Sequence, residues 1–309
     1  MQKVAIIGAG RVGETTASIL AEKEICREVA LLDIREDAAK GVALDICQMS
    51  SFFDFDTRVY GSEDAAIISG ADLIVVTAGL PRKPGMSRSD VLDANVKIID
   101  GILDNVLEYA PDSSLLIVSN PVDILTYHAW KRTGWDRSRV IGQAGVLDAA
   151  RMANFIAVET GFSSLDITTL VLGGHGDTMV PLPRYCTVNG IPVSEFIEEE
   201  KLQEIIARTR DGGAEILALR KNSSAYDAPG ASVAEMVDAI SHNRKRILPT
   251  VAILEGEYGE TLLAMGVPCI LGEGGMEKVI ELKLNENETA LFKQSVSYIR
   301  GDLERLSSL

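Results

Sequence analysis

A histidine between glycines, His175 in the turn at 173–177, is the side chain of this sequence best suited to chemistry. An Asp-x-x-Arg pair, Asp148 and Arg151, stands upstream of it. A histidine exchanges protons near neutral pH, a carboxylate can orient it, and an arginine fork binds anionic groups. Together the three residues predict proton transfer beside a bound carboxylate. Singly, each also fits a turn or a surface ion pair, so the prediction depends on the surrounding fold.

The start of the chain has the pattern of a dinucleotide-binding turn. An apolar run at 4–7 is typical of a strand buried on both faces, and it leads directly into Gly8, Gly10 and Gly13. Gly8 permits the tight turn, Gly10 lets the backbone approach a pyrophosphate, and Gly13 lets helix and strand pack closely. A helix that follows such a turn offers free N–H groups to phosphates.

Asp33 indicates which dinucleotide is preferred. An expected helix over 14–21 and an expected strand over 29–32 lead to this residue, so strand, glycines, helix, strand and acid follow in the required order. Its carboxylate can accept hydrogen bonds from the ribose hydroxyls and would repel a 2′-phosphate, which favours NAD over NADP. Arg35 weakens that preference, because a nearby arginine can accept a phosphate.

Composition excludes several classes of function. The chain has 309 residues, 46% of them hydrophobic, which suffices for one large or two medium domains. Its net charge of −15 argues against binding to nucleic acid. The four cysteines form no CxxC pair and the three histidines lack metal spacing, so we expect reduced thiols and no metal site. Neither a signal peptide nor a membrane span is visible, which predicts a cytoplasmic protein without a membrane partner.

The first half of the chain alternates strands and helices. This order predicts an α/β fold with a Rossmann-type, doubly wound parallel sheet, which binds ligands beyond the carboxyl ends of its strands. The expected strands are 4–7, 29–32, 73–77, 115–119 and 140–143, and the clearest helices are 88–109 and 122–133.

The second half has a mixed α+β pattern. Its expected helices are 146–159, 198–219, 232–244 and 286–306, and its expected strands are 166–172, 184–188, 250–254 and 267–271. We therefore predict a dinucleotide-binding domain over 1–143 and a catalytic, substrate-binding domain over 144–309. No linker separates them, so we expect an intimate interface with the active site in the cleft.

A loop with two arginines, Arg82 and Arg88, follows the expected strand at 73–77. Its prolines and glycines exclude a regular helix or strand until Arg88. A loop in this place can close over a cofactor and exclude water, and arginines match carboxylates bidentately. The alternative is a solvated surface loop.

With these motifs in sequence order, the chain resembles the lactate/malate dehydrogenase superfamily, and within it the malate dehydrogenases of lactate-dehydrogenase-like type. The resemblance covers essentially the whole chain. Its five motifs are the glycine fingerprint with Asp33, the Thr77-Ala78-Gly79 turn with its proline-rich loop, Ser119-Asn120-Pro121, the Asp-x-x-Arg segment at 145–151 and the His175 turn.

The resemblance implies a role for each residue that would contact the substrate. His175 would be the proton donor and acceptor at the substrate oxygen, with Asp148 as its orienting partner. Arg151 would bind the carboxylate next to the reacting carbon, Arg88 would polarise the carbonyl, and Asn120 would bond the substrate oxygen near the nicotinamide. The implied cofactor-binding residues are Gly8, Gly10, Gly13, Asp33, Thr77, Gly79, Asn95, Ser119 and Asn120.

Arg82 matches the position that distinguishes substrates in this family. An arginine there resembles malate dehydrogenases, whereas lactate dehydrogenases usually carry glutamine. The physics agrees, because the second carboxylate of oxaloacetate would be costly to bury unpaired and a second arginine neutralises it. Ala225 points the same way, since lactate dehydrogenases tend to have threonine there.

The resemblance thus implies an NAD-dependent malate dehydrogenase that transfers a hydride reversibly between NADH and oxaloacetate, giving (S)-malate, a reaction of the tricarboxylic acid cycle. Two alternatives stay open: a lactate or other 2-hydroxyacid dehydrogenase, and a dinucleotide-binding protein without catalysis. Relatives form dimers or tetramers, so a homodimer or homotetramer is expected. The apolar faces of the helices 146–159 and 232–244 are either subunit contacts or core, which periodicity cannot distinguish.

Overall fold

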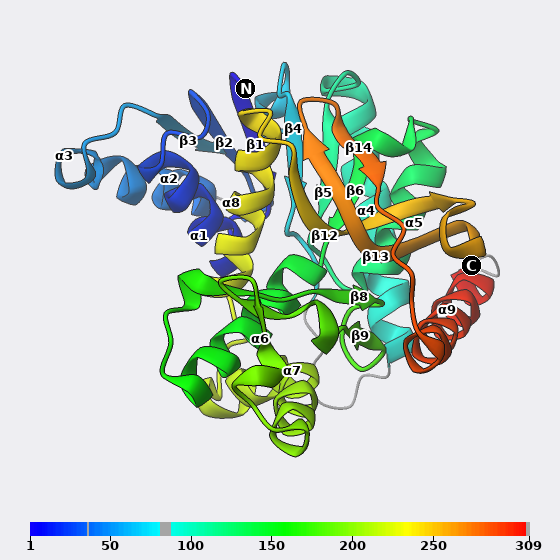
Figure 1. The fold of residues 1–309 in the computed structure, drawn as a ribbon. Helices are drawn as coiled ribbons and strands as arrows, with labels where there is room; N and C mark the ends of the chain where they lie inside the picture. Colours follow the sequence, from blue (N-terminus) through cyan, green and yellow to red (C-terminus); the bar gives the residue numbers. More distant parts are fainter. Residues whose placement is uncertain (36, 81–87, 307–309) are drawn as a thin grey trace.

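The structure is a computed structural model that describes residues 1–35, 37–80 and 88–306, without the side chains of 88–90. One sheet passes through both halves of the chain (Figure 1). Its first six strands, in the order β3-β2-β1-β4-β5-β6, are all parallel, which confirms the predicted Rossmann-type sheet. They are β1 (Lys3–Ile7), β2 (Glu28–Leu32), β3 (Arg58–Ser62), β4 (Leu73–Val76), β5 (Ser114–Ile117) and β6 (Val140–Gln143).

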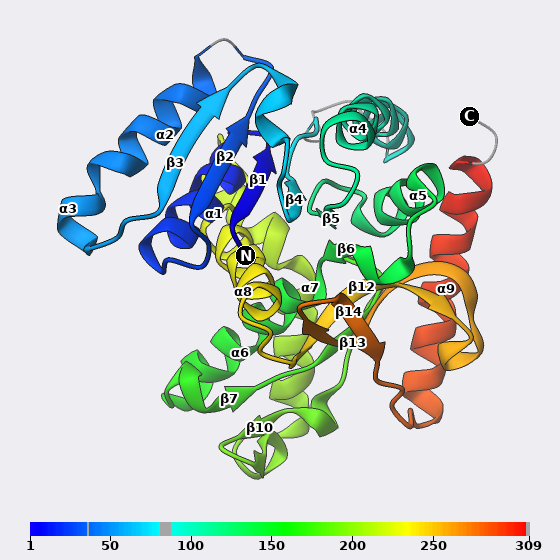
Figure 2. The same ribbon diagram turned by 90° about the horizontal axis from the view of Figure 1, so that it is seen from above.

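Helices cover both faces of this parallel part, as a doubly wound sheet requires. In Figure 2, α1 and α2 lie on one face, and α4 and α5 lie on the other. The strands β1, β2, β4 and β5 are mainly apolar because both faces of the sheet are buried there, and all four residues of β4 are buried. The helices of this half are α1 (Arg11–Glu22), α2 (Ala38–Gln48), α3 (Ser50–Phe53), α4 (Arg88–Tyr109) and α5 (Val122–Thr133).

The second half extends the same sheet with antiparallel strands. The order continues from β6 through β12 (Arg246–Glu255), β13 (Thr261–Gly272), β8 (Val171–Gly173) and β9 (Met179–Pro181), and β14 (Gly275–Val279) pairs with β13. Gln143 of β6 pairs with Thr250 of β12, so main-chain hydrogen bonds join the two halves. The interface between the two halves is therefore close, as predicted, because strands of both halves belong to one sheet.

Among the described residues, a smaller sheet and four helices complete the α+β half. The sheet has the order β11-β10-β7, with β7 (Ile167–Thr168), β10 (Thr187–Val188) and β11 (Ile191–Pro192). The helices are α6 (Gly145–Thr160), α7 (Glu199–Arg220), α8 (Asp227–Ser241) and α9 (Glu286–Leu306). Short 3₁₀ turns are η1 (Ala65–Ile68), η2 (Arg137–Arg139), η3 (Ser164–Asp166), η4 (Pro183–Tyr185), η5 (Val193–Glu195) and η6 (Glu257–Gly259).

The buried apolar side chains of the described residues form two clusters. The larger one runs through the long sheet and its covering helices, and the smaller one lies beneath α6 and α7. The helix expected at 232–244 begins earlier, at Asp227, and its apolar face packs against α1. The two helices approach so closely that a Cβ on Gly230 would lie 2.7 Å from Thr15. That face is therefore core and not a free subunit surface.

Candidate active site

The glycine turn after β1 has no room for a side chain at Gly8 or Gly13. Gly8 has φ +111°, and a Cβ there would lie 2.7 Å from the nitrogen of Ala78. A Cβ on Gly13 would lie 2.0 Å from the carbonyl oxygen of Gly8. Gly10 is the N-cap of α1, and no atom of the described residues lies within 4 Å of the position that its Cβ would take. The free N–H groups of the first turn and this open space fit a pyrophosphate.

Asp33 is held in its ionised form at the end of β2. Its Oδ2 accepts a hydrogen bond from the N–H of Ala9 at 2.8 Å. Arg35 donates from Nε to Oδ1 and from Nη2 to Oδ2, both at 2.9 Å. The hydrogen bonds from Arg35, opposed by partial burial, lower the pKa of Asp33. The guanidinium is thus paired with the acid, which removes the reason to expect a 2′-phosphate and supports NAD.

Hydroxyl groups tie the neighbouring strand ends together. The Oγ1 of Thr77, after β4, donates to the carbonyl of Gly8 at 2.8 Å. The Oγ of Ser119, after β5, donates to the carbonyl of Ala78 at 2.6 Å. These bonds hold three adjacent strand ends at one edge of the sheet, where doubly wound folds bind their ligands.

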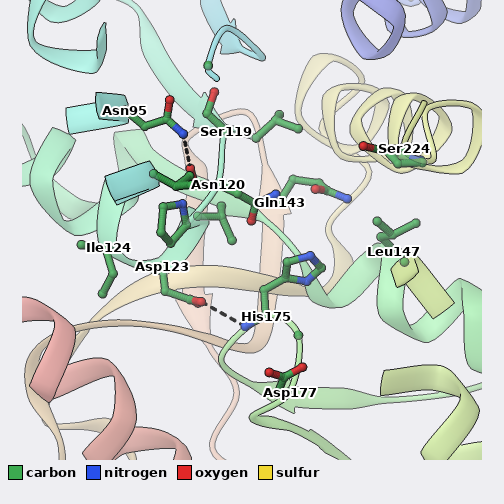
Figure 3. Close-up of a pocket in the computed structure, with 18 of the residues that line it drawn as sticks. Asn95, Ser119, Asn120, Asp123, Ile124, Gln143, Leu147, His175, Asp177 and Ser224 are labelled. Carbon is green, nitrogen blue, oxygen red and sulfur yellow. Dashed lines mark hydrogen bonds between the residues drawn. The ribbon is translucent and has the colours of Figure 1, made fainter. Parts of the chain in front are cut away.

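Asn95 braces the same edge from α4. Its Oδ1 accepts from the N–H of Leu80 at 2.7 Å, and its Nδ2 donates to the carbonyl of Asn120 at 2.7 Å (Figure 3). A Cβ on Gly79 would lie 3.3 Å from this Oδ1, so the glycine leaves room for the side chain of Asn95. The main chain therefore uses both ends of the Asn95 amide, and a direct contact with the cofactor stays a prediction.

The structure brings His175 and Asp148 together, although 27 residues separate them. His175 lies in the turn between β8 and β9, and Asp148 lies in the first turn of α6 with 1% of its surface exposed. The histidine Nδ1 is 2.9 Å from Oδ2 of Asp148. With Nδ1–H donating to the carboxylate, Nε2 is the ring atom left for proton transfer.

Opposing effects set the proton affinity of His175. Burial lowers the pKa of the imidazole, whereas the charge and hydrogen bond of Asp148, together with the charge of Asp123, raise it. The net shift of the His175 pKa is upward. A raised pKa keeps the ring protonated to higher pH, which suits a group that must donate a proton near neutrality.

Arg151 lies one helical turn from Asp148, and its side chain packs against two glycines of α7. Its Nη1 donates to Oδ1 of Asp148 at 3.2 Å, while its Nε is buried and has no hydrogen-bond partner in the part of the chain that the structure describes. A Cβ on Gly212 would lie 3.2 Å from Cδ of Arg151, and one on Gly213 would lie 3.7 Å from Nη2. These two glycines of α7 thus make space for the guanidinium. An unsatisfied buried donor here fits an anionic ligand.

Two side chains that the sequence analysis did not single out fix the His175 turn. Oδ2 of Asp123, in α5, accepts from the N–H of His175 at 3.0 Å (Figure 3). The Oγ of Ser295, in α9, accepts from the N–H of Gly174 at 2.8 Å. The spacing of His175 and its neighbours carried no signal for either contact, because both partners come from distant helices.

Some of these groups line a cavity of about 650 Å³ (Figure 3). Its lining residues do not include Gly8, Gly10, Gly13, Asp33 or Asp148. Its lining includes predicted residues from the strand ends and from the substrate-binding half, namely Thr77, Gly79, Asn95, Ser119, Asn120, Arg151 and His175. Gln143, a further lining residue that the sequence analysis did not select, donates from Nε2 to Oγ of Ser232 at 2.6 Å. The cavity therefore joins the dinucleotide-binding strand ends to the His175 turn.

The structure does not describe the side chains of the two predicted loop arginines. Arg82 lies outside the described residues, and Arg88 is described only as the first residue of α4. Within residues 1–35, 37–80 and 88–306, no three His, Cys, Asp or Glu side chains are arranged to hold a metal ion. None of the helices described in these ranges is long and apolar enough to cross a membrane.

The fold and the cavity define a class of protein: a dehydrogenase with a dinucleotide-binding sheet and a carboxylate-oriented histidine. Comparison with known families agrees. Residues 2–142 match the NAD binding domain of lactate/malate dehydrogenase, and residues 145–308 match the alpha/beta C-terminal domain of the same family. The chain belongs to the lactate/malate dehydrogenase family.

Individual relatives are similar over their whole length. A malate dehydrogenase of Thioalkalivibrio sulfidiphilus is 64% identical over 99% of this chain and 100% of its own. The structure of malate dehydrogenase from Salinibacter ruber superposes with a TM-score of 0.96 at 44% identity, covering 100% of this chain and 98% of the other. A lactate dehydrogenase of Cryptosporidium parvum in complex with lactic acid and NAD has a TM-score of 0.95 at 34% identity, covering 100% and 98% of the two chains.

Proposed function

We propose that this chain is an NAD-dependent malate dehydrogenase that interconverts oxaloacetate and (S)-malate. The observation that carries the proposal is the cluster of His175, Asp148 and Arg151 at a cavity that reaches the strand ends of an NAD-binding sheet. Full-length relatives at 64% and 61% identity that are named malate dehydrogenase support the choice of substrate.

Bound NADH supplies the hydride that reduces the ketone carbon. The side chains of the protein transfer the proton and stabilise the charges that develop. Protonated His175 gives the proton on Nε2 to the oxygen of the substrate, where negative charge develops, and Asp148 keeps the ring oriented and stabilises its protonated form. In the reverse direction, neutral His175 takes the proton of the malate hydroxyl through the same Nε2.

Arg151 holds the substrate for this transfer. Its guanidinium would bind the carboxylate next to the reacting carbon, with Asn120 bonding the substrate oxygen from the end of β5. Arg88, at the start of α4, would polarise the carbonyl. Fixing the substrate between these groups aligns its carbonyl with Nε2 of His175, and such alignment is itself a large part of catalysis.

Arg82 would read the second carboxylate, so its replacement tests the choice of substrate. We expect Arg82→Gln to lower kcat/KM for oxaloacetate by roughly a hundredfold or more, because a buried carboxylate then loses its counter-charge. Activity with pyruvate should fall far less or rise. Steady-state assays with NADH and either keto acid measure both effects.

The matched control for this test is Lys83→Gln, which removes a positive charge from the neighbouring position of the same loop. It should leave the ratio of the two kcat/KM values within about twofold of the parent, since a charge that does not pair with the second carboxylate affects both keto acids alike. Equal losses with both keto acids in Arg82→Gln would show that Arg82 does not distinguish them. The alternative of a lactate dehydrogenase would then be open again.

We propose a functional division into residues 1–143 for NAD and 144–309 for the substrate, a cytoplasmic location, and a homodimer or homotetramer. Among the described residues, α2 and α3 offer the apolar surface best suited to a second copy. Leu44, Phe52 and Phe53 are 62%, 82% and 48% exposed there. Neighbouring apolar side chains at such exposure are typical of an interface. Light scattering measures the assembly.

A further inference from the structure

Asp123 is a buried carboxylate for which the proposed mechanism has no use so far. It lies in the first turn of α5, just after the end of β5, and is 7% exposed. Its Oδ2 accepts the hydrogen bond from the main-chain N–H of His175, and Figure 3 shows this contact at the wall of the cavity. The bond ties the histidine turn to the NAD-binding half of the molecule.

The second oxygen of Asp123 is what makes the residue unusual. Oδ1 is buried and has no hydrogen-bond partner among the described residues. An unsatisfied buried acceptor is costly, and a buried charge costs more. If Asp123 served only to hold a main-chain N–H, an asparagine would do so without burying a charge. The presence of a carboxylate therefore points to a use for the charge itself.

The imidazole of His175 is the group beside this charge. Burial raises the pKa of Asp123 to about 6, so the side chain is largely ionised at neutral pH. Asp148 and Asp123 then favour the protonated imidazole from two different helices, while Arg151 opposes them. The other charged groups that line the same cavity are Asp177 of the histidine turn, Arg210 and Asp211 of α7, and Asp302 and Arg305 of α9.

We propose that Asp123 is a positioning residue for His175: one carboxylate oxygen fixes the main chain of the histidine turn, and the buried negative charge stabilises the protonated imidazole. Asp148 orients the ring through Nδ1, whereas Asp123 binds the main-chain N–H of the same residue. The effect of Asp123 on turnover rests on the proposed function, whereas its effect on the protonation of His175 does not.

Asp123→Asn separates the two parts of this proposal. The amide oxygen of asparagine can still accept the N–H of His175, so the variant keeps the anchor and loses the charge. The chain contains only three histidines, so the ring signals of His128, His175 and His242 can be followed by NMR on histidine-labelled protein. Comparison with His175→Asn assigns the signal of His175.

The titration midpoint of His175 should fall by about half a pH unit or more in Asp123→Asn, because a nearby negative charge is gone. Reduction of oxaloacetate requires protonated His175, so the pH above which kcat/KM falls should move down by the same amount. The ratio of kcat/KM at pH 6 to that at pH 8 should then rise about threefold. The control is Asp100→Asn. Asp100 accepts a hydrogen bond of 2.7 Å from His128, and neither residue lines the cavity. This variant should leave both quantities for His175 unchanged.

An unchanged midpoint of His175 in Asp123→Asn would overturn the proposal, as would a general loss of kcat without any change in the pH profile. If the variant does not fold, the parent protein decides. Its His175 signal should show a second, lower inflection as Asp123 titrates, and a single inflection would contradict the proposal. A shifted midpoint in a protein that does not reduce oxaloacetate would refute the proposed function and leave the Asp123 inference standing.

Discussion

Replacement of His175 by asparagine is expected to lower kcat for oxaloacetate reduction by about 10²–10⁴-fold, the range that a positioned general acid contributes. Asparagine retains a polar side chain of similar reach but cannot supply a proton from Nε2. Binding of NADH should stay within about threefold of the parent, since the glycine turn and Asp33 lie on other elements. Steady-state kinetics measures the first effect and fluorescence titration of NADH the second.

His128→Asn is the matched control, because His128 also pairs with a carboxylate, Asp100, and yet lies away from the cavity. It should keep kcat within about twofold of the parent. A His175→Asn variant that retains more than about a tenth of the parent kcat would remove His175 from the mechanism.

Replacement of Arg151 by glutamine should lower kcat/KM for oxaloacetate by about 10²–10⁴-fold. The guanidinium is only 12% exposed, so the carboxylate it binds would be buried without a counter-charge. Glutamine fills part of the volume between α6 and α7, which limits the structural damage. Both the loss of binding and the loss of alignment should appear, as a higher KM and a lower kcat.

The control for Arg151 is Arg208→Gln on α7, where the arginine pairs with Glu215 and is 51% exposed. An exposed ion pair contributes little, so its loss should change kcat/KM by no more than about twofold. If Arg151→Gln lost activity equally with substrates that carry no carboxylate at the adjoining carbon, then Arg151 would act on the fold and not on the substrate.

Much of the fold follows from hydrophobic pattern. The helices α4, α5 and α9 have the bounds that their periodicity predicts, and β6 matches its expected strand. β3 was not predicted, because its sequence contains Arg58, Gly61 and Ser62 and its pairing with β2 decides its conformation. The helices α2 and α3 and the strands β9 and β14 were also not predicted.

Two strands of the second half were predicted too short. The strands expected at 250–254 and 267–271 are parts of two longer strands, β12 and β13, that extend the parallel sheet. Gly256 and Gly259 mark a turn between them, but the period of the apolar residues does not reveal which strand pairs with β6. Pairing across more than a hundred residues is a tertiary property, so the sequence pattern alone could not supply it.

Within the site, motifs predicted the residues that have a recognisable spacing. Asp148 and Arg151 lie a helical turn apart, and the structure joins them to His175. Asp123 was not predicted, because an aspartate in the first turn of a helix is usually explained by the helix dipole. Asn95 was predicted to bind the cofactor, whereas its described contacts all brace the main chain.

The central claim is that the cavity binds a four-carbon dicarboxylate for reduction at His175. It is tested most directly by the kcat/KM of the parent protein for oxaloacetate and for pyruvate, measured with NADH and repeated with NADPH. The account predicts a preference for oxaloacetate of about a thousandfold or more, and a preference for NADH. Faster turnover of pyruvate than of oxaloacetate would contradict it.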